Sequence, residues 1–170
     1  MRYSIVYCSR TGNTKQIAEA IYAQLPAEDV VYMGVPCEEA LNADVLFVGS
    51  WTDKGTCDPS VADFLSKTEH KTVFLFGTSG FGQSKQYFKQ ILQRVKELLP
   101  QTTTTGQGFM CQGKMPMAVR QRYQAMLEQE PENARFKMMI ENFDAALEHP
   151  NAKDLEEAAA WARSCVEQLL

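Results

Sequence analysis

The chain has 170 residues, of which 45% are hydrophobic, and a formal net charge of -4. This composition is typical of a globular protein with a core of ordinary size, and the charge excludes a strongly basic nucleic-acid binder. No segment has the apolar length of a membrane span, and residues 1–6 lack the long apolar stretch of a signal peptide. We therefore expect a cytoplasmic protein with no membrane span and no nucleic-acid partner.

Short apolar segments alternate with helical patterns over the first two thirds of the chain. Five of them are predicted as strands: residues 3–8, 30–33, 45–49, 72–77 and 107–111. The segments 45–48 and 73–76 are unbroken apolar runs, which is typical of strands covered on both faces. Because helices must supply that cover, the pattern predicts a doubly wound α/β fold with a parallel sheet.

The turn from the first strand to the first helix carries an anion-binding pattern. Its residues are Ser9, Arg10, Thr11, Gly12, Asn13 and Thr14. Unpaired N–H groups at a helix start carry the positive end of the peptide dipoles, so they bind phosphate without a lysine. Gly12 lets the backbone curl around the anion, and the hydroxyls add donors. The Walker spacing is absent, which disfavours nucleoside triphosphates. The alternative is a plain turn followed by a helix N-cap.

The predicted helices lie between and after the strands. They span residues 14–25, 59–67, 84–99 and 152–170, with a short helical turn over 37–42. Ile17, Ile21 and Leu25 share one face of the first helix, and Ile91 and Val95 share one face of the helix over 84–99. These apolar stripes predict packing against the sheet. The last helix is also expected to cover the sheet.

Two further loops are predicted at the edge of the sheet where ligands bind in such folds. The loop after the third strand, 49–58, holds Trp51 among polar residues. A flat aromatic ligand would cover Trp51 by stacking; the alternative is that Trp51 packs as a lid over its own domain. The loop after the fourth strand, 77–85, has three glycines that permit close approach to a planar ring. Phe81 is either a second stacking wall or tucked beneath this loop.

After the fifth strand the pattern changes. Residues 116–129 and 132–147 are predicted as two helices, within a helical insertion of about 114–150 in a single domain spanning 1–170. The methionines of this insertion are Met117, Met126, Met138 and Met139. Because a methionine stripe at helical spacing usually packs, we predict a small cap; the alternative is a surface that faces a partner.

The five cysteines are scattered, and none stands in a Cys-x-x-Cys spacing. This argues against a disulfide framework, a zinc site and an iron–sulfur cluster. With only His70 and His149 available, a transition-metal site made by the protein is also not expected. Any redox chemistry then requires an organic cofactor. Cys8 and Cys111 are predicted as small core residues at strand ends; the alternative, a catalytic thiol, lacks an accompanying histidine.

With the three loops in this order, the sequence resembles the flavodoxin family. The resemblance rests on Ser9-x-Thr11-Gly12-Asn13-Thr14, Gly49-Ser50-Trp51 and Gly77-Thr78-Ser79-Gly80, and it covers residues 1–111 and the last helix. It implies a flavodoxin-like, five-stranded parallel sheet of order 2-1-3-4-5, with helices on both faces, and a noncovalently bound FMN. The residues implied to cradle the FMN phosphate are Ser9, Arg10, Thr11, Gly12, Asn13 and Thr14. Those implied to flank the isoalloxazine, with Trp51 stacked on it, are Ser50, Trp51, Thr52, Asp53, Lys54 and Gly55. Those implied to contact the pyrimidine edge are Thr78, Ser79, Gly80, Phe81 and Gly82.

The chain departs from the family in its charges. Flavodoxins that carry electrons usually place acidic side chains around the ring, whereas the residues bordering the expected site here include Arg10, Lys54, Lys85 and Lys114. Asp53 and Asp58 are a modest acidic contribution. Tyr87 is predicted too far into its helix to stack on the ring. Residues 112–115 follow the fifth strand and reach the same edge, where they are candidates for contact with the cofactor or a partner.

The resemblance implies a cytoplasmic electron-transfer protein that takes electrons from a donor reductase and delivers them to an acceptor enzyme, such as a partner reductase. No paired acid and base stands near the loops, which favours a carrier over an enzyme with its own substrate. A second hypothesis is a flavodoxin-like oxidoreductase that acts on an organic substrate such as a quinone or a tetrapyrrole, with the insertion forming one wall of the pocket, or a reductase accessory subunit of the bile-pigment type. A third is a noncatalytic structural partner. No catalytic or metal-binding residue is assigned.

Overall fold

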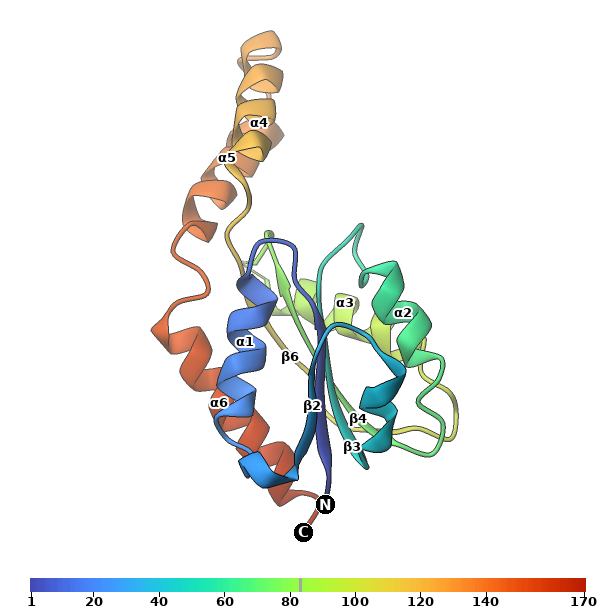
Figure 1. The fold of residues 1–170 in the computed structure, drawn as a ribbon. Coiled ribbons are helices and arrows are strands. Elements are labelled where there is room, and N and C mark those ends of the chain that lie inside the picture. The colour runs from blue at the N-terminus through green and yellow to red at the C-terminus, as the bar shows by residue number, and fades with distance from the viewer. Residues whose placement is uncertain (83) are drawn as a thin grey trace.

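A parallel β-sheet forms the centre of the molecule (Figure 1). The computed structural model describes residues 1–82 and 84–170. The strands are β1 (Tyr3–Cys8), β2 (Val30–Gly34), β3 (Val45–Trp51), β4 (Thr72–Ser79), β5 (Thr104–Thr105) and β6 (Phe109–Gln112). The strand order is β2-β1-β3-β4-β5, and β6 also pairs with β4; each of these pairings is parallel. The predicted order 2-1-3-4-5 is confirmed, and the carboxyl ends of β1, β3 and β4 meet at one edge.

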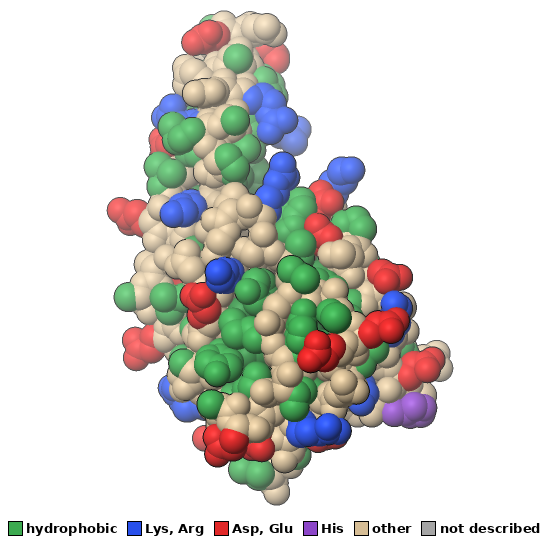
Figure 2. All heavy atoms as spheres, in the orientation of Figure 1, with side chains coloured by type: hydrophobic (Ala, Val, Ile, Leu, Met, Phe, Trp, Pro, Cys, Tyr) green, Lys and Arg blue, Asp and Glu red, His purple; other side chains and the backbone are tan. Residues whose placement is uncertain are grey.

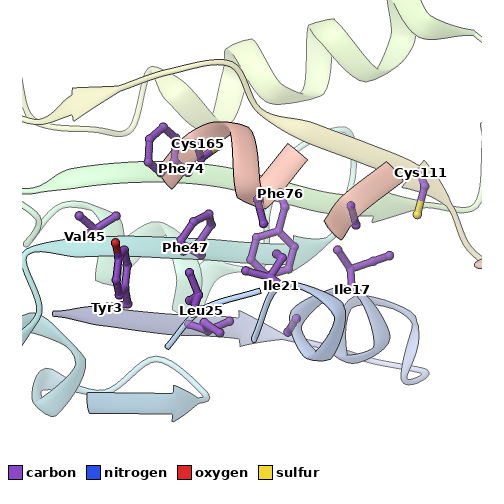
Figure 3. Close-up of a cluster of buried hydrophobic side chains, with 14 residues drawn as sticks. Tyr3, Ile17, Ile21, Leu25, Val45, Phe47, Phe74, Phe76, Cys111 and Cys165 are labelled. Carbon is purple, nitrogen blue, oxygen red and sulfur yellow. The ribbon is translucent and has the colours of Figure 1, made fainter. Parts of the chain in front are cut away.

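Helices cover both faces of the sheet, as the continuous apolar strands predict (Figure 1). On one face lie α1 (Asn13–Tyr22) and α6 (Ala152–Glu167), and on the other α2 (Pro59–Leu65) and α3 (Lys85–Lys96). Two short 3₁₀ helices, η1 (Ala27–Asp29) and η2 (Glu38–Asn42), complete the connections. Successive residues of one strand face opposite cores: Phe47 packs on the α1/α6 side, and Leu46 and Val48 pack on the α2/α3 side. Figure 3 shows the first of these cores, with Ile17 and Ile21 of α1 against the sheet.

The fifth position of the sheet is divided into two short strands, which differs from the single strand predicted over 107–111. Both β5 and β6 pair with β4, and the segment between them does not. At Gly108 a Cβ atom would lie 2.9 Å from the carbonyl oxygen of Leu75, so the chain passes too close to β4 for any side chain. The Gln107 carbonyl instead accepts a hydrogen bond of 2.9 Å from the indole of Trp161 in α6. The observed strand β6 therefore starts two residues later than predicted, and the short strand β5 precedes it.

Two helices, α4 (Met117–Gln129) and α5 (Ala134–Ala146), form a hairpin that projects from the carboxyl edge of the sheet (Figure 1). The helices pack on each other, and Arg120 and Asp144 join them by two hydrogen bonds of 2.8 and 3.1 Å. The methionine stripe packs only in part, so the hairpin is not the packed small cap that was predicted: the side chains of Met117 and Met138 are exposed, whereas those of Met126 and Met139 are half-buried. Tyr123 and Phe143 are buried instead.

No helix within residues 1–82 and 84–170 has the length and apolar character needed to cross a membrane.

Candidate functional site

The turn between β1 and α1 gathers backbone N–H groups around one oxygen atom. The N–H groups of Gly12 and Lys15 donate to Ser9 Oγ, at 3.1 and 3.3 Å. Gly12 has a φ of 89°, in the left-handed region, and a Cβ there would meet nothing within 4 Å. Glycine is thus needed here for its backbone conformation, not for space. A turn whose amides converge on an oxygen at a helix N-terminus suits a phosphate oxygen equally well.

Two buried polar side chains at the start of α1 connect this turn to the neighbouring segments. Thr14 Oγ1 lies 2.9 Å from the hydroxyl of Thr78, at the end of β4. The Asn13 amide donates to the Lys114 carbonyl at 2.8 Å. Asn13 Oδ1 is buried and has no hydrogen-bond partner among the residues the structure describes. The site thus contains an unused acceptor for a ligand hydroxyl or N–H group.

The segment after β3 forms a tight turn that is fastened to α3. Asp53 and Thr56 exchange two backbone hydrogen bonds of 2.8 and 3.0 Å, while Lys54 and Gly55 have φ values of 50° and 80°. Positive φ at both central residues is the mark of a type I′ turn. Arg94 of α3 donates to the Gly55 carbonyl at 3.0 Å. This turn is therefore held in place at the mouth of the site.

Trp51, the last residue of β3, is half-buried with its indole beside two polar neighbours. Its Nε1 donates to Asp58 at 3.1 Å, and the Arg10 guanidinium lies 5.1 Å from the ring centroid. Asp58 also caps α2, and the Ser60 hydroxyl and backbone N–H lower the pKa of its carboxyl below the ordinary value, with the Trp51 indole adding to the effect. Burial, with Asp58 nearby, raises the pKa of the Cys8 thiol. Both effects favour the neutral thiol form of Cys8 over the thiolate.

The loop after β4 is tied to the hairpin through the carbonyl oxygen of Gly80. Both Gln112 Nε2 and Asn142 Nδ2 donate to this oxygen at 3.0 Å, and Gln112 also donates to Asn142 at 3.2 Å. The side chains of Gln112 and Asn142 are buried, and the bond between them is shielded from water, while the two bonds to Gly80 are partly buried. Asn142 belongs to α5, and the network therefore fixes the base of the hairpin against the loop.

These loops border one cleft of about 370 Å³, within the size range of small-molecule sites. Its lining includes the predicted residues Arg10, Thr11, Asn13, Trp51, Thr52, Lys54, Gly55, Thr78, Ser79, Gly80 and Phe81. The predicted residues outside the lining are Ser9, Gly12, Thr14, Ser50, Asp53 and Gly82. Ser9, Gly12 and Thr14 build the turn before α1, and Ser50 holds the loop by accepting from the Asp58 N–H at 2.9 Å.

Several residues of the cleft were not assigned from the sequence. They are Tyr87, Gly113, Lys114, Met115, Pro116, Val119 and Arg122. Gly113, Lys114 and Met115 belong to the segment predicted to reach this edge, which the structure confirms. Tyr87 was excluded by its place in a helix, but α3 begins at the same edge and Tyr87 lies in its first turn, three residues after the N-cap Ser84. That spacing is the signal that could have identified it.

The chain belongs to the flavodoxin family, because the model of the flavodoxin domain matches residues 4–163. The fold agrees: flavodoxin 2 of Bacillus cereus superimposes with a TM-score of 0.64 at 20% identity, over 99% of each chain. Among curated relatives, the chain is 40% identical to the flavodoxin-like domain-containing protein BilS of Clostridium symbiosum, over 91% of this chain and 90% of that one. It is 30% identical to the BilS protein of Clostridioides difficile, over 96% of both.

Proposed function

We propose that the protein binds FMN noncovalently in the cleft and passes electrons from a donor reductase to an acceptor enzyme. The observation that carries the proposal is the convergence of three features on one cleft: an anion-binding turn at a helix N-terminus, a half-buried tryptophan and a glycine loop. Membership of the flavodoxin family supports the same cofactor. When bound, FMN supplies the redox chemistry through its ring.

The proposed phosphate site is the turn from Ser9 to Thr14. The N–H groups of Gly12 and Lys15, which now share the Ser9 hydroxyl, would donate to phosphate oxygens. Thr11 lines the cleft and would add a hydroxyl donor, and the Arg10 guanidinium would supply charge. Thr14 would orient the turn through its contact with Thr78.

The proposed ring site lies between the turn after β3 and the loop after β4. Trp51 would stack on the isoalloxazine, since a half-buried indole at the cleft gains cover from a flat ligand. Phe81 lines the cleft from the opposite loop and is 38% exposed, so it is available as a second wall. The unused acceptor on Asn13 would be satisfied by a hydroxyl of the FMN ribityl chain.

The chemistry of the lining favours a carrier. Among the described residues that line the cleft there is no carboxylate, imidazole or thiol. These are the groups that most often serve as general acids and bases, and a carrier of electrons needs neither. The proposal includes a cytoplasmic location, because the cysteines are free thiols and such thiols are usual in reducing compartments.

One observation favours a second candidate function, an oxidoreductase or reductase accessory subunit acting on an organic substrate such as a quinone or a tetrapyrrole. Pro116, Val119 and Arg122, from the start of the hairpin, line the same cleft as Trp51. The hairpin would thus form one wall of a substrate site. Reoxidation of the reduced flavoprotein by a quinone or a tetrapyrrole, with no acceptor protein present, would favour this candidate over a carrier.

Titration with FMN and with riboflavin tests the proposal, because only FMN carries the phosphate. We expect FMN to remain bound after gel filtration and to bind more tightly than riboflavin. The double variant Thr11→Ala/Thr14→Ala should weaken FMN binding and leave riboflavin binding unchanged. Thr104→Ala, at the far side of the sheet, is the matched control. Equal affinity for the two flavins would contradict the phosphate site. If no flavin binds, the remaining hypothesis is a noncatalytic structural partner.

A further inference from the structure

The cleft is bordered by cations that come from four separate segments. They are Arg10, Lys54, Lys114 and Arg122, and all four side chains are exposed. The described part of the lining contains neither Asp nor Glu. No salt bridge within residues 1–82 and 84–170 involves any of the four. Figure 2 shows Lys and Arg side chains on both sides of the notch between the hairpin and the sheet.

The proposed phosphate site accounts for Arg10 but not for the other cations. Arg10 belongs to the turn before α1 and lies against Trp51. Lys54 stands in the turn after β3, Lys114 follows β6, and Arg122 belongs to α4. We call Lys54, Lys114 and Arg122 the cationic rim. A phosphate held by backbone N–H groups does not need three additional cations spread around the mouth of the cleft.

Two exposed apolar side chains, Phe81 and Met138, and the half-buried Tyr87 stand directly beside the cationic rim. Phe81 and Tyr87 line the cleft and also a neighbouring groove of about 390 Å³, which Met138 of α5 borders from the hairpin side. Met138 is 58% exposed. An apolar centre with polar and charged residues around it is the usual anatomy of a protein–protein interface, and methionine and aromatic residues are enriched there.

The hairpin presents its share of this surface in a fixed position. Its base is held by Asn142, which donates to the Gly80 carbonyl, and its two helices are joined by the Arg120–Asp144 pair. Lys114 is held by its backbone, which accepts from Asn13 and donates to the His149 carbonyl at 2.8 Å. A surface that is ordered before contact loses less entropy on binding.

We propose that the cationic rim, with Phe81 and Met138, docks the acidic face of a partner protein at the mouth of the cleft. The partner is a redox protein with a cluster of Asp and Glu around its own electron-exchange site and an apolar side chain that enters the groove beside Met138. Charge complementarity identifies this occupant: the cations Arg10, Lys54, Lys114 and Arg122 outnumber the nearby carboxylates of Asp53 and Asp58, so the mouth of the cleft keeps a net positive charge. The inference rests on the proposed electron-carrier function.

The test uses two small haem proteins of opposite surface charge as probes, the acidic cytochrome b5 and the basic cytochrome c. Each is added to the isotopically labelled protein, with and without FMN, and the amide NMR shifts are followed. We expect cytochrome b5 to bind, with the largest shifts around the rim, and its dissociation constant to rise several-fold between about 0.01 M and about 0.15 M salt. Tighter binding of cytochrome c, or binding of neither probe, would overturn the proposal.

A matched pair of charge reversals locates the effect. Arg122→Glu should weaken cytochrome b5 binding by about tenfold, because it removes one attraction and adds a repulsion. Arg135→Glu makes the same change of charge near the far end of the same hairpin and should alter the dissociation constant less than twofold. Equal effects of the two reversals would overturn the assignment to the rim.

Two further arms separate the alternatives. If citrate binds at the rim while both cytochromes fail to bind, the surface serves a small anionic ligand and the docking proposal is overturned. The apoprotein arm separates this inference from the cofactor assignment. If the protein does not bind FMN but still binds cytochrome b5 through the rim, the proposed function is overturned and the docking surface stands. If it binds FMN but not cytochrome b5, the docking surface is overturned and the cofactor assignment stands.

Discussion

The sheet and the helical hairpin of this protein are stabilised in different ways. The sheet is covered on both faces, and side chains such as Phe47 are completely buried among residues distant in sequence. The hairpin packs mainly on itself, and its two helices bury few large side chains, Tyr123 and Phe143 among them. The sheet edge offers backbone groups in fixed positions, as a cofactor site requires, whereas the hairpin contributes exposed charged and apolar side chains. We infer that the sheet edge determines which cofactor is bound, and that the hairpin determines which partner molecule approaches the cofactor.

The largest expected effect contrasts one buried phenylalanine of the sheet, Phe47, with one of the hairpin, Phe143. Phe47 packs against Phe74 and Trp161, with ring centroids 5.5 and 5.7 Å apart. Phe47→Ala should lower the free energy of unfolding of the whole protein by about 3–5 kcal/mol, measured by urea denaturation. Phe143→Ala removes an equally buried ring, but we expect the loss of structure to be confined to the hairpin, with part of the helical circular dichroism lost and the sheet still folded. A single unfolding transition, shifted equally by both variants, would show that the two regions are one cooperative unit.

The next effect tests the sheet edge as a cofactor site. Trp51→Ala should weaken FMN binding by about 1–3 kcal/mol, because the stacking surface is lost. Trp51→Phe keeps a flat ring and should recover most of the affinity, which separates stacking from the hydrogen bond to Asp58. The measurement is a fluorescence titration with FMN. A dissociation constant unchanged in Trp51→Ala would mean that the indole is only a lid over its own domain.

A smaller effect concerns the junction of the two regions. Asn142→Ala removes a buried donor to the Gly80 carbonyl, and we expect a loss of about 1–2 kcal/mol together with faster amide hydrogen exchange in the loop after β4. The control is Asn133→Ala, in the same hairpin. Asn133 caps α5 at the far end by accepting from Arg135 and Phe136, so its loss should cost about 1 kcal/mol without changing exchange in that loop. Unchanged exchange in Asn142→Ala would show that the hairpin is held by other contacts.

The smallest effect depends on pH. Asp58 caps α2, and its pKa is lowered chiefly by the hydrogen bonds from Ser60. The folded state therefore favours the carboxylate, so this contribution is present above the ordinary carboxyl pKa of about 4 and is lost as the pH falls through the lower folded-state value. Asp58→Ala should lower stability by about 1 kcal/mol at pH 7, and the difference should shrink below about pH 4. Asp63→Ala, which removes an exposed carboxylate of the same helix, should have almost no effect; a pH-independent loss in Asp58→Ala would contradict the account.

The sequence predicts the sheet well because its evidence is local. Unbroken apolar runs such as 45–48 can only be accommodated between two layers of helices, and the strand order followed from the family resemblance. The turn before α1 is also marked locally, since a glycine and hydroxyl residues between a strand and a helix predict either an anion-binding turn or a plain helix N-cap. The boundary errors were small: α1 ends at Tyr22 instead of residue 25, where 3₁₀-type hydrogen bonds from Gln24 and Leu25 replace the helical pattern.

Local sequence patterns could not predict the direction in which the hairpin projects from the sheet. Helical periodicity shows which residues of α4 and α5 share a face, but it does not show where the pair points relative to the sheet. That direction depends on Gln112, Gly80 and Asn142, which are separated by 30 residues or more and join only through side-chain hydrogen bonds. No local pattern marks such a network. For the same reason, the second hypothesis placed the insertion at one wall of the pocket but could not name Val119 and Arg122 as the residues that line it.

Amide NMR shifts during titration with FMN test the central claim most directly, because one spectrum reports on both regions. The account predicts the largest shifts at three places: Gly12 to Thr14, the turn around Gly55, and Gly80. Amides in the far half of the hairpin, around Arg135, should remain unchanged. Shifts confined to the hairpin, or no shifts at all with saturating FMN, would contradict the assignment of the sheet edge as the cofactor site.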